Sequence, residues 1–312
     1  MIEATGLTKR YGKTLAVNNL SFSVAAGQVT GFLGPNGAGK STTMRMILGL
    51  DNPTGGQVTI GGKKYHDLKE PLRTVGALLD AKWVHPNRSA RAHLQWMAKS
   101  NRIPSTRVDE VLDTVGLTSV AGKRAGGFSL GMSQRLGIAA ALLGDPEVLL
   151  FDEPVNGLDP EGILWIRKFM HRLAEEGRTV FVSSHLLSEM ALTASNLVVI
   201  GRGQLISQSS TQDFVSRAAE NTVKVRSPQL AELRTALQRA SAGVTGDDAA
   251  LVVSGMDSDK IGEIAAANGI VLHELSPQTG SLEQAFMQIT GDSVEYHTGL
   301  DAEAQHVLES AK

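Results

Sequence analysis

The sequence predicts an α/β fold, with a mixed β core and a helical subdomain, followed by a small C-terminal α+β domain. Three observations predict it. A glycine-rich loop at 34–42 stands between an apolar strand and a helix. Mainly apolar runs at 147–151 and 179–183 are typical of buried parallel strands. Beyond residue 215 the pattern changes to short strands alternating with amphipathic helices.

The glycine-rich loop is the most informative segment. Its residues, GPNGAGKST, fit the phosphate-binding pattern G-x-x-x-x-G-K-[ST]. A strand, a tight turn and a helix N-terminus aim several backbone N–H groups at one point, which suits a polyphosphate. We expect Lys40 to neutralise the β- and γ-phosphates and Ser41 to hold Mg²⁺. The other loop residues expected around the phosphates are Gly34, Pro35, Asn36, Gly37, Ala38, Gly39 and Thr42.

A chance glycine-rich turn is the alternative interpretation. The bare pattern should arise by accident in about one or two chains per hundred of this composition. The strand before the loop and the helix after it lower that frequency further. Nucleotide binding is therefore the interpretation that we carry forward.

Composition limits the remaining possibilities. The chain has 312 residues, enough for about two domains, and a net charge of −2, so no basic field favours nucleic acid. It has no cysteine, which excludes disulfides and thiolate metal sites. No run approaches the roughly 18 apolar residues of a membrane span, and the N-terminus lacks the apolar core of a signal peptide. We expect a soluble protein that stays inside the cell.

The chain is expected to divide into domains at 1–215 and 222–290, with the helical subdomain at about 86–143. The second domain has an order that resembles a ferredoxin-like arrangement. Its expected strands are 222–226, 251–254 and 270–275, and its expected helices are 228–240, 257–268 and 281–289. The polar tail at 291–312 is expected to be flexible.

Two acidic residues, Asp152 and Glu153, end the apolar run at 147–151. Burying adjacent carboxylates is costly unless they have a role. We expect Asp152 to hold Mg²⁺ opposite Ser41, and Glu153 to polarise a water towards the γ-phosphate. A strand that simply ends in solvated acids is the alternative, and the phosphate loop upstream argues against it.

A further segment, 128–135, leads into a helix predicted at 133–143. Ser129 is a candidate cap for that helix. With the phosphate loop and the acidic pair before and after it in the chain, this segment resembles the signature motif of ATP-binding cassette (ABC) proteins. The family's usual Leu-Ser-Gly-Gly-Gln is Phe-Ser-Leu-Gly-Met here. Departures of this kind look like those of the antibiotic-resistance, bacitracin-type exporters. The resemblance covers roughly 2–215 and implies an ABC cassette of the P-loop NTPase class.

Other residues fit this family in order. The resemblance implies that Tyr11 stacks on adenine, that Asp159 belongs to a loop crossing the interface between two cassettes, and that His185 contacts the γ-phosphate. Taken alone, Tyr11 would by default be interpreted as ordinary packing, and a lone histidine is more often structural than catalytic. The shared order of the motifs favours the functional interpretation.

One position departs from the family. A glutamine usually follows the strand after the second glycine-rich turn, where it reaches the metal and the attacking water. Asp80 occupies that position here. A carboxylate can ligate Mg²⁺ directly but adds a negative charge beside ATP.

The resemblance also implies partners. One phosphate loop and one signature segment in the chain require a second cassette, most simply in a homodimer. Ser129 and Gly131 would then contact the ATP held by Lys40 of that copy. Separate permease subunits would span the membrane, with this chain on its cytoplasmic face. Trp83 and Trp96 either anchor that permease or pack within the helical subdomain.

The function implied is ATP hydrolysis that powers export of a drug, an antibiotic or a peptide. A soluble ABC ATPase acting on ribosomes or DNA is an alternative, as is the ATPase of an importer or a lipid exporter. A small-molecule kinase or GTPase leaves the signature segment and His185 unexplained.

Overall fold

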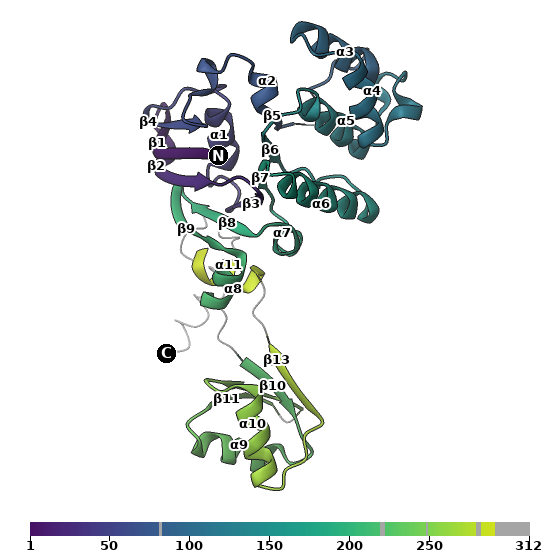
Figure 1. Cartoon of the computed structure of the whole chain (residues 1–312). Helices are drawn as coiled ribbons and strands as arrows, with labels where there is room; N and C mark the ends of the chain where they lie inside the picture. Colours follow the sequence, from purple (N-terminus) through teal and green to yellow (C-terminus); the bar gives the residue numbers. More distant parts are fainter. Residues whose placement is uncertain (81–82, 219–221, 248, 279–281, 291–312) are drawn as a thin grey trace, which may run out of the picture. The chain divides into compact units, whose positions relative to one another are not determined.

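The computed structural model describes residues 1–80, 83–218, 222–247, 249–278 and 282–290 (Figure 1). These residues form two compact units that divide between Ser210 and Thr211. The sequence predicts the boundary a few residues later, after 215. Residues 211–215 belong instead to the second unit, because helix α8 packs against helix α11 there. The predicted tail at 291–312 lies outside the described residues.

The first unit contains two sheets. The smaller sheet is antiparallel, in the order β2-β1-β4, and the larger has the order β5-β6-β7-β3-β8-β9 and is parallel except for β9. The strands of the smaller sheet are β1 (Ile2–Tyr11), β2 (Thr14–Val24) and β4 (Gly55–Ile60). Those of the larger sheet are β3 (Gln28–Leu33), β5 (Val75–Leu78), β6 (Val148–Asp152), β7 (Thr179–Ser183), β8 (Asn196–Gly201) and β9 (Gln204–Ser210).

The register of the larger sheet brings the predicted site residues to one edge. Strand β7 lies between β6 and β3, with Asp152 opposite Ser183 and Phe32 opposite the same Ser183. The carboxyl ends of these three parallel strands therefore meet. The phosphate loop leaves β3 at this edge, while Glu153 follows β6 and His185 follows β7.

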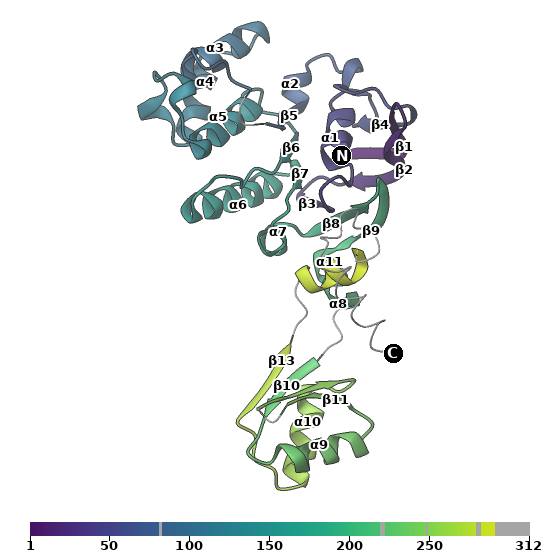
Figure 2. The ribbon, with the colours of Figure 1, turned by 180° about the vertical axis from the view of Figure 1, so that it is seen from behind.

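Helices cover these sheets in two groups. Helix α1 contacts β2 and β4 of the smaller sheet and β6 of the larger, whereas α3, α4 and α5 pack on one another as a helical subdomain (Figures 1 and 2). The helices are α1 (Lys40–Ile47), α2 (Pro71–Thr74), α3 (Ala90–Ser100), α4 (Thr106–Thr114), α5 (Leu130–Leu142), α6 (Pro160–Glu175) and α7 (Leu187–Thr193). Short 3₁₀ turns lie at Tyr65–Asp67, Thr118–Val120 and Ala125–Gly127.

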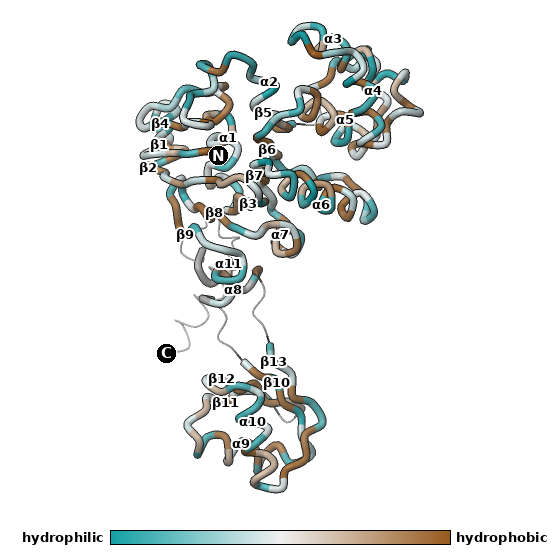
Figure 3. The backbone as a smooth tube through the Cα atoms, viewed as in Figure 1, coloured by the Kyte–Doolittle hydropathy of each residue, from teal (hydrophilic) through white to brown (hydrophobic). Residues whose placement is uncertain are grey.

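The core of the first unit lies between the two sheets. Three phenylalanines from β2, β3 and β7 pack together there, with ring centroids 4.9 to 5.8 Å apart. They are Phe22, Phe32 and Phe181, and all three are buried. Apolar stretches gather along the strands of the larger sheet (Figure 3). This buried sheet gives the edge that carries the site a rigid base.

The second unit contains a four-stranded antiparallel sheet in the order β11-β12-β10-β13. Its elements are α8 (Thr211–Ala218), β10 (Thr222–Arg226), α9 (Leu230–Arg239), β11 (Gly243–Gly246), β12 (Leu251–Ser254), α10 (Ser258–Ala267), β13 (Glu274–Gln278) and α11 (Leu282–Thr290). From β10 to β13 the order is β-α-β-β-α-β, which is the ferredoxin-like order. Apolar residues of β10, β12, α9 and α10 form its core.

Candidate active site

The phosphate loop is closely packed against neighbouring backbone. Gly39 has φ of 101°, and a Cβ there would lie 2.6 Å from the carbonyl oxygen of Ala16. A Cβ on Gly34 would lie 2.5 Å from the carbonyl oxygen of Ile200. Only glycine therefore fits these two positions. The loop wraps a cavity of about 330 Å³, whose lining is Ala16, Pro35, Asn36, Gly37, Ala38, Gly39, Lys40, Ser41, Thr42, Leu79, Asp152 and Glu153.

Lys40, the first residue of α1, is held by its own loop. Its side chain is buried, and Nζ donates to the carbonyl oxygens of Gly34, at 2.5 Å, and Pro35, at 3.3 Å. Burial lowers the pKa of Lys40, while the carboxylates of Glu153 and Asp152 act in the opposite direction. An anion in the cavity would add counter-charge beside this buried ammonium.

Ser41 and Asp152 form an oxygen pair at the floor of the cavity. Ser41 Oγ donates to Asp152 Oδ2 at 2.8 Å, and Ser183 Oγ donates to the other carboxylate oxygen. A hydroxyl and a carboxylate are hard oxygen ligands that fit Mg²⁺. Within the described ranges, no group of three or more His, Asp or Glu side chains is arranged to hold a metal ion by itself. Mg²⁺ commonly takes one or two protein ligands and completes its shell with substrate phosphate and water.

Glu153 has a constrained backbone. Its φ of 51° lies in the left-handed region, which costs a residue with a side chain on the order of 1 kcal/mol. Its N–H donates to Ser183 Oγ at 3.0 Å. Its carbonyl oxygen accepts from Gln134 Nε2 at 3.1 Å and from the N–H of Asn156 at 3.2 Å. These bonds fix a conformation that the chain would otherwise avoid.

The carboxylate of Glu153 meets His185 across the sheet edge. Oε2 lies 2.7 Å from His185 Nδ1 and accepts from the backbone N–H of His185 at 3.2 Å. The histidine side chain is half exposed, while that of Glu153 is mostly covered. A carboxylate held by an imidazole beside a phosphate cavity can position and polarise a water molecule.

Tyr11 lies away from the phosphate cavity, beside α1. Its ring is partly exposed, and its hydroxyl donates to Asp51 Oδ2 at 2.7 Å. Arg45 Nε donates to the same oxygen at 2.8 Å, and Lys9 Nζ lies 4.8 Å from the ring centroid. Burial, then the bond to Asp51, raises the pKa of Tyr11, while Arg45 and Tyr11 hold the pKa of Asp51 below its usual value. The ring is thus anchored at its edge and available for stacking.

The signature segment and the loop after β6 begin two helices. Ser129 caps α5, because its Oγ accepts from the N–H of Met132 at 3.2 Å. Asp159 caps α6, because its Oδ1 accepts from the N–H of Gly162 at 2.8 Å. Ser129 and Gly131 do not line the cavity around Lys40 of the same chain. The structure therefore brings together the phosphate loop, Asp152, Glu153 and His185, but not the signature residues.

Asp80 follows the end of β5 and is exposed. Leu79 lines the phosphate cavity, whereas Asp80 is not among the residues around it. Its role as a metal ligand stays a prediction.

Three residues at the site were not predicted from the sequence. Ser183 bridges Asp152 and Glu153, Asp51 anchors Tyr11, and Gln134 holds the Glu153 carbonyl. Ser183 had a usable signal, because it ends an apolar run parallel to the one that ends in Asp152. Gln134 follows the signature motif, where the family also has a glutamine. The contacts of Asp51 and Gln134 depend on tertiary packing.

Comparisons with known proteins identify the family of this chain. A family model described as "ABC transporter" matches residues 17–156, and a domain of unknown function (DUF8746) matches residues 221–283. The bacitracin transport ATP-binding protein BcrA of Bacillus licheniformis is 46% identical over 67% of this chain and 69% of its own length. The protein of the same name from Enterococcus faecalis is 36% identical over 93% of this chain and 96% of its own length.

A solved structure supports the same assignment. It is the dimeric, post-hydrolysis state of the ATP-binding cassette MJ0796 bound to ADP and Pi. It is 25% identical, has a TM-score of 0.62, and covers 68% of this chain and 99% of that one. No described helix is both long enough and apolar enough to cross a bilayer. With its phosphate cavity and its acidic edge, this chain belongs to the ATP-binding subunits of ABC transporters and is an ATPase.

Proposed function

We propose that the chain works as a homodimer on the cytoplasmic face of the membrane, where it powers export of a drug, an antibiotic or a peptide through separate permease subunits. The observation that carries the catalytic part is the Glu153–His185 pair at the rim of the phosphate cavity. The substrate class is supported by the two bacitracin transport relatives, one of which matches over nearly its whole length.

Within this proposal, the site residues divide the work of binding and hydrolysing ATP. The loop N–H groups and Lys40 bind the β- and γ-phosphates of ATP. Ser41 and Asp152 would hold Mg²⁺, which when bound supplies positive charge against the phosphate oxygens. Glu153 orients the attacking water and takes up its proton, and His185 holds the Glu153 carboxylate towards the γ-phosphate. Tyr11 stacks on the adenine.

The proposed dimer is supported by the position of the signature residues. Ser129 is exposed at the start of α5, outside the cavity of its own chain. The N–H groups at this helix start can bind an anion supplied by another molecule. The solved relative is dimeric. A second copy would place its Ser129 and Gly131 against the ATP held by Lys40, and its Asp159 loop at the interface.

A permease contact is supported by two exposed aromatic side chains. Trp83 is 61% exposed and Trp96 is 57% exposed, so packing within the helical subdomain does not account for either. The guanidinium of Arg88 lies 5.0 Å from the Trp96 ring. A cavity of about 360 Å³ near this region is lined by Val84, Pro86, Ala125, Gly126, Phe128, Leu130, Ser133 and Leu136. Exposed Trp beside an apolar cavity is typical of an interface anchor.

The test coexpresses this chain with the permease subunits that copurify with it. Coexpression in a bacitracin-sensitive host should give resistance, and Glu153→Gln should abolish it while lowering the ATPase rate about 10² to 10⁴-fold. Trp83→Ala and Trp96→Ala should release the chain from the membrane fraction without weakening ATP binding. Full resistance with Glu153→Gln would refute the proposal.

A further inference from the structure

Gln134 occupies an unusual place on α5. The helix buries a mainly apolar face, made of Leu136, Ile138, Ala139, Ala141 and Leu142. Gln134 is buried with them, at 4% exposure, and its Nε2 donates 3.1 Å to the carbonyl oxygen of Glu153. Because that partner is an acceptor, the amide nitrogen must face it.

The other end of this amide has no such partner. Within the described part of the chain, Gln134 Oε1 is buried and makes no hydrogen bond. A buried acceptor without a partner destabilises a fold, so stability alone does not explain a glutamine at this position. A residue that breaks a local packing rule is often retained for function.

The same helix touches the Glu153 loop at a second point. Gly157 has φ of 73°, and a Cβ there would lie 2.2 Å from Leu130 Cδ2. Leu130 thus covers Gly157 directly, one turn before Gln134 meets Glu153. Helix α5 holds the loop from Glu153 to Gly157 at both ends.

We propose that Gln134 is a positioning residue, which keeps Glu153 in its left-handed conformation and ties it to the helix that begins with the signature residues. The inference rests on the proposed function, in which Glu153 orients the water. In the proposed dimer, binding of the α5 N-terminus to the partner's nucleotide would be mechanically coupled to the position of Glu153 at the chain's own nucleotide.

The test compares full-length Gln134→Met with the wild type, using Mg²⁺ and ATP. Methionine keeps the length of the side chain but donates no hydrogen bond. We expect kcat to fall about five- to tenfold while KM for ATP changes less than about twofold. Thermal stability should stay equal or rise, because an unpaired buried oxygen is removed. Amide exchange in residues 153–158 should accelerate.

Gln208→Met is the matched control. Gln208 Nε2 also donates to a backbone carbonyl, that of Ser23 at 2.8 Å, but between β9 and β2. It should change neither kcat nor exchange at 153–158. Unchanged kcat and exchange in Gln134→Met would overturn the inference, as would a loss of kcat that only follows a loss of thermal stability.

Glu153→Gln separates the two proposals. If it keeps full ATPase activity, the proposed function fails. Faster exchange at 153–158 in Gln134→Met would still support the positioning contact in that case. If Glu153→Gln is inactive and Gln134→Met behaves as the wild type, the positioning contact alone fails.

Discussion

At the residue scale, the site depends on a buried charge and a constrained backbone, each of which costs free energy. Lys40 is buried in its own loop with two carboxylates nearby, and Glu153 has a left-handed backbone. Substrate phosphate would relieve the first of these costs, because it pairs the buried ammonium. The site is thus prepared for an anion.

The lowered pKa of Lys40 predicts a pH-dependent affinity for ATP. Between this lowered pKa and the ordinary value of 10.5, the nucleotide-free fold binds fewer protons at Lys40 than the unfolded chain. Its free energy of unfolding should therefore rise with pH across this window. ATP favours the charged ammonium, so binding should take up a proton there and weaken as pH rises. Titration calorimetry in buffers of different ionisation enthalpy measures both the proton uptake and the ATP affinity at each pH.

Lys40→Arg is the control, because a guanidinium stays charged at every pH used. Its ATP affinity, although lower, should vary less with pH. The same pH dependence in wild type and variant would assign the effect to another group.

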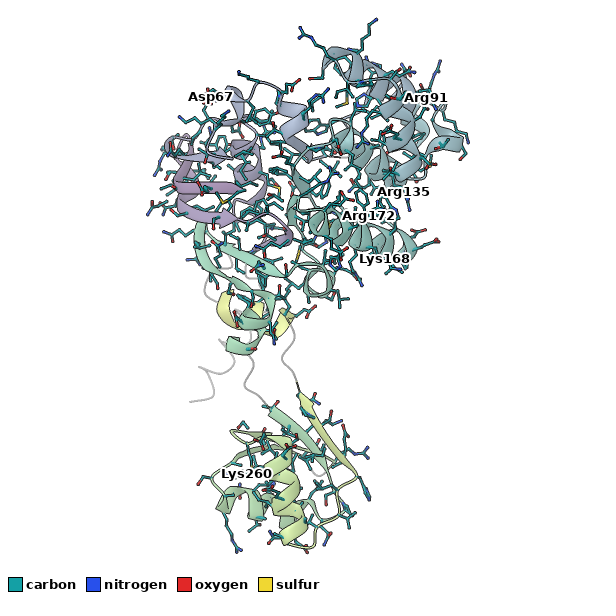
Figure 4. The ribbon with its side chains drawn as sticks, viewed as in Figure 1. Asp67, Arg91, Arg135, Lys168, Arg172 and Lys260 are labelled. Atoms are coloured by element: carbon teal, nitrogen blue, oxygen red, sulfur yellow. The ribbon has the colours of Figure 1, made fainter. Side chains whose placement is uncertain are left out.

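Asp80 predicts a particular dependence on Mg²⁺. If its carboxylate contributes to the metal site, Asp80→Gln should raise the Mg²⁺ concentration for half-maximal ATPase activity by about threefold, because a neutral amide attracts the ion less. Asp67→Asn, at the exposed carboxylate labelled in Figure 4, is the matched control and should leave the curve unchanged. Identical curves for wild type and Asp80→Gln would remove Asp80 from the site.

At the element scale, the sequence predicts the buried strands better than the edge strands. β6 and β7 lie where their apolar runs predict them, because continuous apolar residues are needed inside a parallel sheet. In the second unit, the predicted strand at 270–275 is wrong in its position. Ile270 is buried outside any strand, and β13 instead contains Pro277, which an edge strand tolerates.

The boundaries of helices are also predicted less accurately than their existence. The sequence predicts that the helix after the signature segment begins at residue 133, whereas α5 begins at Leu130 because Ser129 caps it. Capping is a local signal, so this start was within reach of the sequence. Strand β11 was not, because two of its residues are glycines and its pairing with β12 is long-range. The contacts between α5 and the Glu153 loop likewise exist only in the folded chain.

The contact between α5 and this loop predicts a reciprocal pair of substitutions. Gly157→Ala adds a Cβ in a left-handed conformation against Leu130, so we expect a loss of roughly 2 kcal/mol in the free energy of unfolding. Leu130→Ala removes the facing atoms. In the double variant, the part of this loss that comes from the steric clash should be recovered. A loss of about 1 kcal/mol in the free energy of unfolding should remain, because alanine disfavours the left-handed backbone. Urea unfolding of the four proteins measures this, and strictly additive losses would contradict the contact.

Helices α5 and α6 are also joined at the surface. The guanidinium of Arg135 lies 4.5 Å from the centroid of the Trp165 ring, which stacks on Phe169, and Arg172 covers Phe169 at 5.2 Å. Arg135 and Arg172 are labelled in Figure 4. This contact links α5, which begins at the signature segment, to α6, which Asp159 caps. The signature segment and the predicted interface loop are therefore held by two helices that contact each other.

At the scale of the whole molecule, each unit has its own core. Apolar residues of the first unit pack between its two sheets, and those of the second pack between its sheet and the helices α9 and α10. All residues of the phosphate cavity, together with Glu153 and His185, belong to the first unit. ATP binding should therefore not require the second unit.

A fragment of residues 1–210 tests this independence. The match to the solved MJ0796 cassette spans 99% of that chain but only 68% of this one. That solved cassette therefore folds with about two thirds of the length of this chain. The fragment ends at the last residue of β9, before α8, and it keeps every strand of the larger sheet. We expect one cooperative unfolding transition and an ATP dissociation constant within about twofold of the full chain. A folded fragment that no longer binds ATP would show that residues beyond Ser210 support the nucleotide site.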